Sequence, residues 1–415
     1  MKNHIDITNK TKCCGCRACE QKCPNKCITM IEDNEGFFYP YVNEEKCIKC
    51  EVCIKHCPQL NNTIFDNQLK NPEVYAAKIK KENILMKSSS GGMFSAIAER
   101  VIDKGGVVFG CAFDENLIAQ HIAVQNKDDL KLLRGSKYVA SNLNNTYIQA
   151  RNYLESGKIV FYTGLPCHIA GLKGFLGKTY DNLITADLIC HGTPSQKLFS
   201  KYIKWIEKKY SKKAFSKVNN NLEDANVYSY DFRNKETKGW RCGNIKIVFG
   251  NARKTIVIRP ISLIDPYFSS FLTSKTYRPS CYSCKYACET REGDFTFADY
   301  WGIELFHPEF YSPKGVSLLL INTQKGKSFF KEFKDDIDYI LSDIKYAIQR
   351  NGHLNKPAER PKIRDIIYDE IDTLNFEEYA KKYLYPNGKL GLWIKYMLPE
   401  NIKIKIKQIL YKVRN

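Results

Sequence analysis

Two short runs of cysteines near the N-terminus share one spacing, C-x2-C-x2-C-x3-C-P, and thiolates at this spacing bind iron–sulfur clusters. The first run is closed by Pro24 and the second by Pro58. In paired runs of this kind, the fourth cysteine of each run is displaced along the chain and reaches the cluster of the other run. The spacing therefore predicts two [4Fe–4S] clusters, one bound by Cys13, Cys16, Cys19 and Cys57 and the other by Cys47, Cys50, Cys53 and Cys23.

Zinc is the alternative metal for clustered cysteines. Four-thiolate zinc sites usually consist of two C-x2-C pairs separated by a longer span, whereas each run here keeps its cysteines close together and ends at a proline. The spacing therefore favours iron–sulfur clusters, which transfer single electrons. Cys14 and Cys27 fall outside the pattern and are expected to be small apolar residues. His56 is expected at the surface or beside a cluster rather than as a ligand.

A third group of cysteines lies far along the chain, in the stretch R-P-S-C-Y-S-C-K-Y-A-C. Cys281, Cys284 and Cys288 are spaced as metal ligands are, but three thiolates leave a cluster one ligand short. Cys190 lies in a glycine-containing turn after a predicted buried strand, so it is a candidate for the fourth ligand. Cys167, in another polar turn, is the competing candidate, and the sequence leaves both open.

Composition indicates a globular, cytoplasmic protein. The chain has 415 residues, 43% of them hydrophobic and 26% charged, which is enough for two or three domains with a sizeable core. It contains 17 cysteines, an odd number, and its N-terminal stretch lacks the apolar segment of a secretory signal, so metal ligands are expected instead of disulfides. No apolar run approaches the roughly 20 residues that a membrane-spanning helix needs.

The net charge of +19 favours an acidic protein, nucleic acid or an anionic membrane surface as partner, and a basic solvated surface without a specific partner is the alternative. The tail 389–415 places apolar residues near one helical face and most of its basic residues elsewhere, as membrane-surface helices do. Docking on the protein's own core is the alternative, and the run I-K-I-K-I-K also alternates like a strand. A basic stretch at 208–217 resembles a nucleic-acid patch, but we expect a solvated loop there and no nucleic acid.

The middle of the chain alternates predicted strands and helices, which indicates an α/β domain with a buried sheet. After a polar, asparagine-rich linker at 61–72, strands are predicted at 74–79, 106–113, 159–164 and 183–190, and a helix at 92–103. A strand at 36–42 is expected to pack aromatic rings near the N-terminal clusters. No G-x-G-x-x-G follows any of these strands, so the dinucleotide-binding fingerprint is absent.

Three polar turns in this domain are candidate site walls, because α/β folds bind ligands beyond the carboxyl ends of their strands. S-S-S-G-G, at 88–92, opens a helix whose free N–H groups favour a phosphate, although an ordinary helix cap is the alternative. T-G-L-P-C-H and C-H-G-T-P-S follow predicted strands. His168 and His191 in these turns are candidate proton-transfer residues, with a structural role as the alternative.

These motifs together resemble the coenzyme F420 hydrogenase/dehydrogenase beta-subunit family, in a bacterial branch with an N-terminal ferredoxin segment. The resemblance covers residues 10–320 and includes S-S-S-G-G-M-F-S-A, G-S-K-Y-V, T-G-L-P-C-H-I-A-G-L, D-L-I-C-H-G-T-P-S and G-D-F-T-F-A-D-Y-W-G. It implies an FAD in the α/β domain with an iron–sulfur cluster close to it. The candidate cofactor contacts are Ser90, Gly91, Gly92, Gly135, Ser136, Lys137, Thr163, Gly164 and Asp299.

Family members act on the deazaflavin F420 or on a chlorophyll side chain, and many bacterial relatives lie among polysaccharide-synthesis genes. This chain departs from the F420-specific members in its appended two-cluster module and long basic C-terminus, which puts F420 in doubt as its partner. The appended module suggests that electrons come from a soluble carrier, and acidic carriers such as ferredoxin or flavodoxin suit a positively charged surface.

The predicted fold is α+β and α/β, with a dicluster ferredoxin-like domain, an α/β flavin-binding domain and a helical C-terminal region. The predicted function is that of a flavin-dependent iron–sulfur oxidoreductase that acts on an organic or glycan-related substrate. A non-catalytic electron-input subunit is the alternative. The expected boundaries are 1–60 for the ferredoxin domain, 61–72 for the linker, 73–320 for the flavin and iron–sulfur domain, 321–388 for the helical region and 389–415 for the tail.

Overall fold

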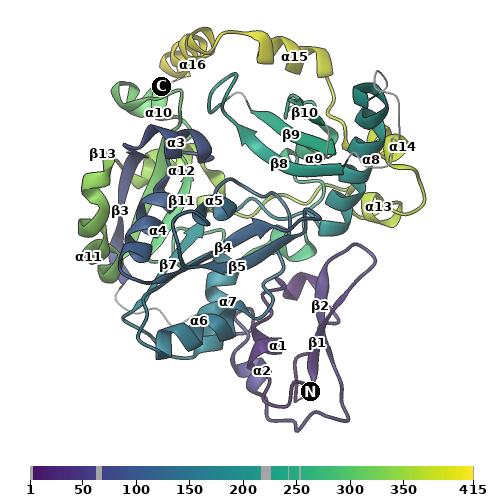
Figure 1. Cartoon of the computed structure of the whole chain (residues 1–415), viewed down its shortest axis with the longest axis vertical. Helices are drawn as coiled ribbons and strands as arrows, with labels where there is room; N and C mark the ends of the chain where they lie inside the picture. Colours follow the sequence, from purple (N-terminus) through teal and green to yellow (C-terminus); the bar gives the residue numbers. More distant parts are fainter. Residues whose placement is uncertain (1–2, 62–67, 216–225, 242, 252–253, 415) are drawn as a thin grey trace.

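The computed structural model describes residues 3–61, 68–215, 226–241, 243–251 and 254–414. A small N-terminal module lies at one end of the longest axis, a large mixed sheet occupies the middle, and two C-terminal helices lie at the other end (Figure 1). No helix among the described residues is both long and apolar enough to span a bilayer.

The N-terminal module consists of two similar halves around an antiparallel hairpin. Its elements are η1 (Lys10–Lys12), α1 (Ala18–Lys22), β1 (Ile28–Glu32), β2 (Phe38–Val42) and α2 (Val52–Lys55). Arg17 and Glu51, at the same place in each cysteine run, both adopt the left-handed conformation, with φ of 60° and 59°. The sequence repeat is therefore also a repeat of backbone geometry, and β2 confirms the strand predicted at 36–42.

The central sheet has eight strands in the order β13-β3-β12-β11-β7-β6-β4-β5. Strands β4, β6, β7 and β11 run parallel to their neighbours in this group, and antiparallel pairs with β5 and β12 flank them. All the strands predicted between 74 and 190 are present. The bounds are β3 (Gln68–Ile79), β4 (Val107–Phe113), β5 (Ala119–Val124), β6 (Val160–Thr163), β7 (Leu183–Leu188), β11 (Phe295–Asp299), β12 (Ser317–Thr323) and β13 (Ile337–Leu341).

Both faces of the central sheet are buried by helices. Helices α4 (Met93–Asp103) and α11 (Gln324–Phe333) cover one face, where Val108 and Phe161 point. Helices α6 (Thr146–Glu155) and α7 (Pro166–Leu176) cover the other face. This two-sided burial explains the nearly continuous apolar runs of the parallel strands. Shorter helices α3 (Glu82–Lys87) and α5 (Leu130–Leu133) complete this part.

A second, three-stranded antiparallel sheet packs beside the central one. It comprises β8 (Asn226–Asn234), β9 (Asn244–Asn251) and β10 (Lys254–Ile258). An aromatic core joins this sheet to α8, α9 and the segment 363–385. The other elements here are α8 (Gln196–Phe215), α9 (Pro266–Leu272), η3 (Pro279–Ser283), α10 (Ile303–Phe306), η4 (Pro308–Phe310), α13 (Arg364–Asp369), α14 (Phe376–Tyr379) and η7 (Ala380–Leu384).

The C-terminal third is less helical than the sequence suggested. The region 321–388 was expected to be helical, but α11 ends at Phe333 and, after η5 (Lys334–Asp336), β13 pairs with β3 at the sheet edge. A strand at the edge of the sheet needs to bury only one residue here, Ile337. Its apolar pattern was therefore misread as that of a helix. Helix α12 (Ile344–Arg350) and η6 (Gly352–Leu354) follow.

The ends of two predicted segments also differ from the structure. Strand β3 begins at Gln68, so the last part of the expected linker belongs to the sheet, while 62–67 lies outside the described residues. The tail forms two helices, α15 (Lys389–Met397) and α16 (Glu400–Arg414), which excludes the strand interpretation of I-K-I-K-I-K. The basic stretch 208–217 was expected to be a loop, but α8 continues to Phe215, and its side chains beyond Tyr210 lie outside the described residues.

Candidate iron–sulfur centres and cofactor cavity

The outer cysteine site lies near the N-terminus, at the end of the module farthest from the central sheet. Its cysteines surround a cavity of about 10 Å³, and Cys50 is exposed to solvent. Burial raises the pKa of the Cys53 thiol, whose sulfur accepts a hydrogen bond from the Ile5 amide at 3.2 Å. Cys27, expected as a spare apolar residue, also lines this cavity. The expected ligands that meet here are Cys23, Cys47, Cys50 and Cys53.

The inner cysteine site lies between the module and the central domain. Burial, and then the neighbouring thiols of Cys13 and Cys57, raise the pKa of the Cys19 thiol. The Cys14 thiol, burial and then the thiols of Cys57 and Cys19 raise the pKa of Cys16, which packs in the core of α6 and α7. The structure thus brings together Cys13, Cys16, Cys19 and Cys57, the four residues that the spacing assigned to one cluster.

The module docks on a row of glycines along α7. A methyl group added to Gly171 would lie 2.8 Å from Cβ of Cys16 and 2.7 Å from the Tyr147 hydroxyl, and one added to Gly174 would lie 2.7 Å from the carbonyl of His56. The His56 ring also contacts the Gly174 carbonyl at 2.6 Å. Only glycine permits this approach, so the inner site is held directly against the domain that contains the third group of cysteines.

We expect Gly171→Ala to weaken this docking by about 1–3 kcal/mol, because overpacking a close contact forces the backbones apart. Limited proteolysis should release the N-terminal module faster in this variant than in the parent chain. Gly352→Ala is the matched control, since nothing lies within 4 Å of a methyl group placed there. Equal proteolysis rates for all three proteins would show that the glycine row does not hold the module.

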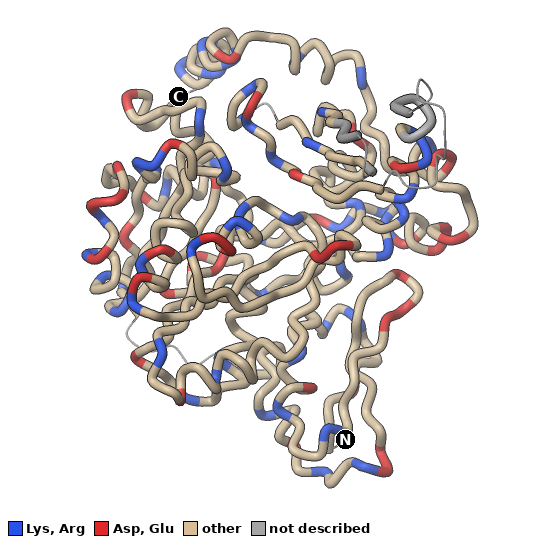
Figure 2. Tube along the Cα trace, in the orientation of Figure 1, with Lys and Arg blue, Asp and Glu red and all other residues tan. Residues whose placement is uncertain are grey.

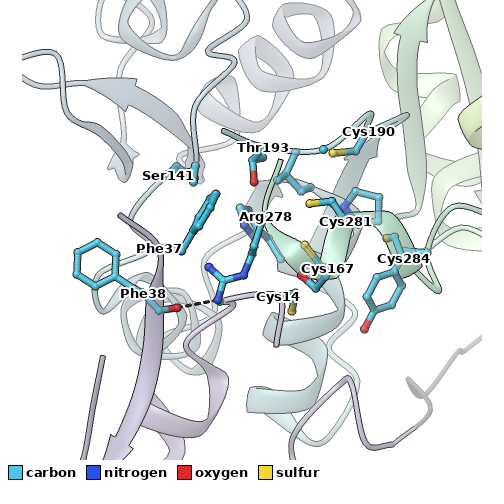
Figure 3. Close-up of a pocket in the computed structure, with 18 of the residues that line it drawn as sticks. Cys14, Phe37, Phe38, Ser141, Cys167, Cys190, Thr193, Arg278, Cys281 and Cys284 are labelled. Carbon is cyan, nitrogen blue, oxygen red and sulfur yellow. Dashed lines mark hydrogen bonds between the residues drawn. The ribbon is translucent and has the colours of Figure 1, made fainter. Parts of the chain in front are cut away.

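The third site is a cavity of about 250 Å³ between the inner site and the central sheet, and five cysteines line it. Cys190 follows β7, Cys167 lies in the first turn of α7 after β6, and Cys281 and Cys284 belong to η3 or its end. Since β6 and β7 are parallel neighbours, their carboxyl ends place Cys167 and Cys190 side by side. Figure 3 shows these sulfurs and that of Cys14 around one space.

Cys288 does not line this cavity, although the sequence grouped it with Cys281 and Cys284. Its thiol donates to the carbonyls of Lys285 and Thr290, at 3.4 and 3.2 Å, so the local turn directs it away. Cys167 and Cys190 are therefore no longer alternatives for a single fourth ligand. The structure offers both, together with Cys281 and Cys284, as a complete set of four.

The chemistry of these thiols fits a metal cluster. Burial, and then the thiols of Cys281 and Cys284, raise the pKa of the Cys190 thiol, so thiolates can form together only if a metal centre balances their charge. Cysteines spaced around a cavity suit a larger, polynuclear centre.

Arg278 connects the inner and third sites. Its Nε donates to the Cys13 carbonyl at 2.8 Å, and Nη2 donates to the Phe38 carbonyl at 2.8 Å and to Sγ of Cys13 at 3.7 Å. The guanidinium stacks on Tyr39, 4.2 Å from the ring centroid. The same residue lines the third cavity and lies three positions before Cys281 (Figure 3). Sequence reasoning missed it, because its partners come from distant segments.

A cofactor cavity of about 420 Å³ lies above the carboxyl ends of the parallel strands, where α/β folds bind ligands. Gly92, in the left-handed conformation with φ of 85°, opens α4 at its wall. Gly91 does not line it: the Gly91 amide donates to Ser317 Oγ at 2.8 Å, and a methyl group there would lie 2.3 Å from the Ala77 carbonyl. The expected contacts that do line the cavity are Ser90, Gly92, Gly135, Ser136, Lys137, Thr163, Gly164 and Asp299.

The cavity combines positive charge with flat rings. Burial lowers the pKa of Lys137, whose ammonium donates to the Leu132 and Arg134 carbonyls at 3.0 and 2.9 Å. The rings of Trp240 and Trp301 stack with centroids 5.3 Å apart. Such a lining suits a ligand with anionic groups and an aromatic ring. The cationic residues of the lining are Arg134, Lys137, Arg233 and Arg241.

Arg233, Trp240 and Asp299 form a connected group in this wall. Asp299 accepts from Arg233 at 2.7 Å and from the Trp240 indole at 2.9 Å. Burial works to raise the pKa of the Asp299 carboxyl, but the Arg233 charge outweighs it and holds this pKa below its usual value. The sequence named only Asp299, since Arg233 and Trp240 lie in the β8–β9 region, where no motif marked them.

The two candidate catalytic histidines lie in different environments. His191 lines both the third cavity and the cofactor cavity, and its ring centroid lies 4.2 Å from that of His353. Burial lowers the pKa of His191 to about 4. His168 lines only the third cavity, and burial lowers its pKa to about 4 as well. At these pKa values both imidazoles are neutral at neutral pH and are weak bases there. His121, which the sequence did not mark, also lines the cofactor cavity.

The third cavity and the cofactor cavity share one wall. Leu165, Ser141 and the run from Cys190 to Thr193 line both. A cluster bound by Cys190 would therefore be a direct neighbour of any cofactor in the larger cavity. The order along the molecule is outer site, inner site, third site and cofactor cavity.

Comparison with protein families identifies the same segments. Residues 157–346 match the C-terminal model of the coenzyme F420 hydrogenase/dehydrogenase beta subunit, residues 74–147 match its N-terminal model, and residues 12–61 match a 4Fe-4S dicluster domain. No curated protein matches the chain. One similar solved structure is a chain of the xenon-derivatised F420-reducing [NiFe] hydrogenase complex from Methanosarcina barkeri, at 15% identity and a TM-score of 0.38, covering 77% of this chain and 92% of that one.

Proposed function

Because the chain belongs to the coenzyme F420 hydrogenase/dehydrogenase beta-subunit family and carries a 4Fe-4S dicluster domain, we propose that it is an iron–sulfur flavoprotein that moves electrons between a soluble carrier and an organic substrate. The observation that carries the proposal is the order of its sites. Three groups of cysteines follow one another from the exposed Cys50 to Cys190, and Cys190 lines the cofactor cavity.

The residues of the cofactor cavity support FAD as the bound group. The N–H groups at the start of α4, with Lys137 and Arg134 nearby, favour a diphosphate, and aromatic residues of the lining such as Tyr138 and Phe271 can pack against a ring system. FAD would exchange electron pairs with a substrate and single electrons with clusters. Asp299 holds Arg233 and Trp240 in place in the wall of the cavity.

The net charge supports an acidic electron carrier as partner. A net charge of +19 favours an acidic donor such as ferredoxin or flavodoxin, which would approach the exposed outer site. We propose an organic or glycan-related substrate and a place in polysaccharide biosynthesis, in the cytoplasm or on the inner face of the membrane. His191, at the wall shared by the two cavities, is the candidate to transfer a proton to or from that substrate.

Anaerobic purification followed by iron, sulfide and flavin quantification on one sample tests this function. We expect about twelve irons, about twelve sulfides and one FAD per chain, the content of three [4Fe–4S] clusters and a flavin. A UV–visible spectrum should then bleach on addition of reduced ferredoxin. About eight irons without flavin, even after reconstitution, would instead favour a non-catalytic electron-input subunit.

A further inference from the structure

The two C-terminal helices expose an unusual amount of apolar surface. In α15, Leu390, Trp393, Ile394 and Met397 are all exposed, and they are spaced i, i+3, i+4 and i+7, which places them on one face. Leu390 is 71% exposed. No residue of α15 is buried, so this face has no partner among the described residues. A surface helix of a globular protein normally turns such a face toward the core.

Helix α16 repeats the arrangement and shows which way the apolar face points. Its inner side is docked on α10, where Lys407 and Gln408 bind Glu304 and the Tyr411 ring meets Phe306 edge to face, 5.9 Å between centroids. The exposed apolar stripe lies on the side of the helix away from this contact. Its members are Ile402, Ile406, Ile409, Leu410 and Val413.

Lysines border the apolar stripe of α16 on both sides. At 100° per residue, Lys405 and Lys412 fall along one edge of the stripe and Lys403 along the other. Lys405 and Lys412 pair with no carboxylate among the described residues, and Glu400 is the only acidic residue of the tail. Figure 2 shows the basic residues gathered on this last helix. An apolar face edged by cations fits a surface of acyl chains beneath anionic headgroups.

We propose that α15 and α16 form a docking surface for an anionic membrane, with the apolar residues inserted at the headgroup boundary and the lysines at the phosphates. The lysine border favours this occupant over a second copy of this chain, whose corresponding surface would carry the same charge. Figure 1 places these helices at the opposite end of the long axis from the N-terminal module. Docking would therefore leave the outer cysteine site facing the solvent, where a soluble carrier can reach it.

Co-sedimentation of the full chain with vesicles tests the proposal without reference to redox activity. We expect binding to vesicles of phosphatidylcholine with phosphatidylglycerol, and little binding to phosphatidylcholine alone. Ile409→Glu with Val413→Glu should weaken binding at least about tenfold, because two inserted side chains become charged. Lys405→Gln with Lys412→Gln should weaken it by roughly tenfold or more and reduce its salt dependence.

Leu341→Glu is the matched control, since Leu341 on β13 is 70% exposed and lies outside the tail. It should bind vesicles as the parent does, and unchanged iron content would show that every variant is folded. Equal binding to neutral vesicles, or parental binding by the Ile409→Glu and Val413→Glu variant, would overturn the proposal. So would sedimentation showing a dimer that this variant disperses, without vesicle binding. Vesicle binding by a chain that lacks flavin would overturn only the proposed redox function.

Discussion

Replacing Cys281 with alanine is expected to lower the iron content from about twelve to about eight atoms per chain, whereas Cys288→Ala should leave about twelve. Cys281 lines the third cavity with Cys167, Cys190 and Cys284, and losing one of four thiolates leaves the cluster without a ligand. Cys288 lies outside that cavity and donates to carbonyls of its own turn. Iron and sulfide quantification after anaerobic reconstitution measures the difference.

Further alanine variants sharpen the assignment. Cys167→Ala and Cys190→Ala should each contain about four fewer irons per chain than the parent, as Cys281→Ala does. Cys14→Ala should retain them, because Cys14 comes from the N-terminal module and the central domain supplies a complete set without it. Iron loss in Cys288→Ala with normal iron in Cys167→Ala would reject the ligand set and return the site to the grouping that spacing alone suggested.

The cysteine sites show how far spacing can predict a site. In the N-terminal runs, ligands lie within one or two turns of backbone, so local spacing predicts which residues meet; only the exchange of Cys23 and Cys57 between halves depends on the repeat. In the third site, the ligands come from η3 and from the ends of two parallel strands. The C-x2-C spacing predicted that Cys281 and Cys284 are ligands. The three-residue spacing to Cys288 could not predict whether Cys288 also reaches the cluster, because a local turn directs its thiol outward.

In the fold and the cofactor cavity too, local sequence predicts some features, whereas others depend on the packing of distant segments. Buried strands such as β4 and β7 are evident because both of their faces are apolar, and a polar turn after each strand points to the ligand edge. The edge strand β13 was missed because it buries little. Arg233 and Trp240 reach the cavity only because the second sheet packs beside the first, and no local pattern encodes that packing.

Arg278→Met is expected to lower the reduction potential of the inner site by on the order of 100 mV. The guanidinium of Arg278 lies 3.7 Å from Sγ of Cys13, and no carboxylate among the described residues pairs with it. A positive charge stabilises the more negative, reduced form of a cluster. At an effective dielectric constant of about 20, one charge about 5 Å away contributes roughly 3 kcal/mol, and about 2.3 kcal/mol corresponds to 100 mV for one electron.

A redox titration followed by electron paramagnetic resonance would measure this shift and distinguish it from a loss of structure. Arg278→Lys should restore part of the potential, since it keeps the charge but not the fixed hydrogen bonds to Cys13 and Phe38. Lys412→Met is the control, because it removes the same charge from α16, at the opposite end of the molecule from the N-terminal module. If Arg278→Met kept all its iron and every potential stayed unchanged, Arg278 would only hold the module in place. A lowered reduction potential of the inner site would instead show that the Arg278 charge favours electron transfer to this site, which lies beside the third site.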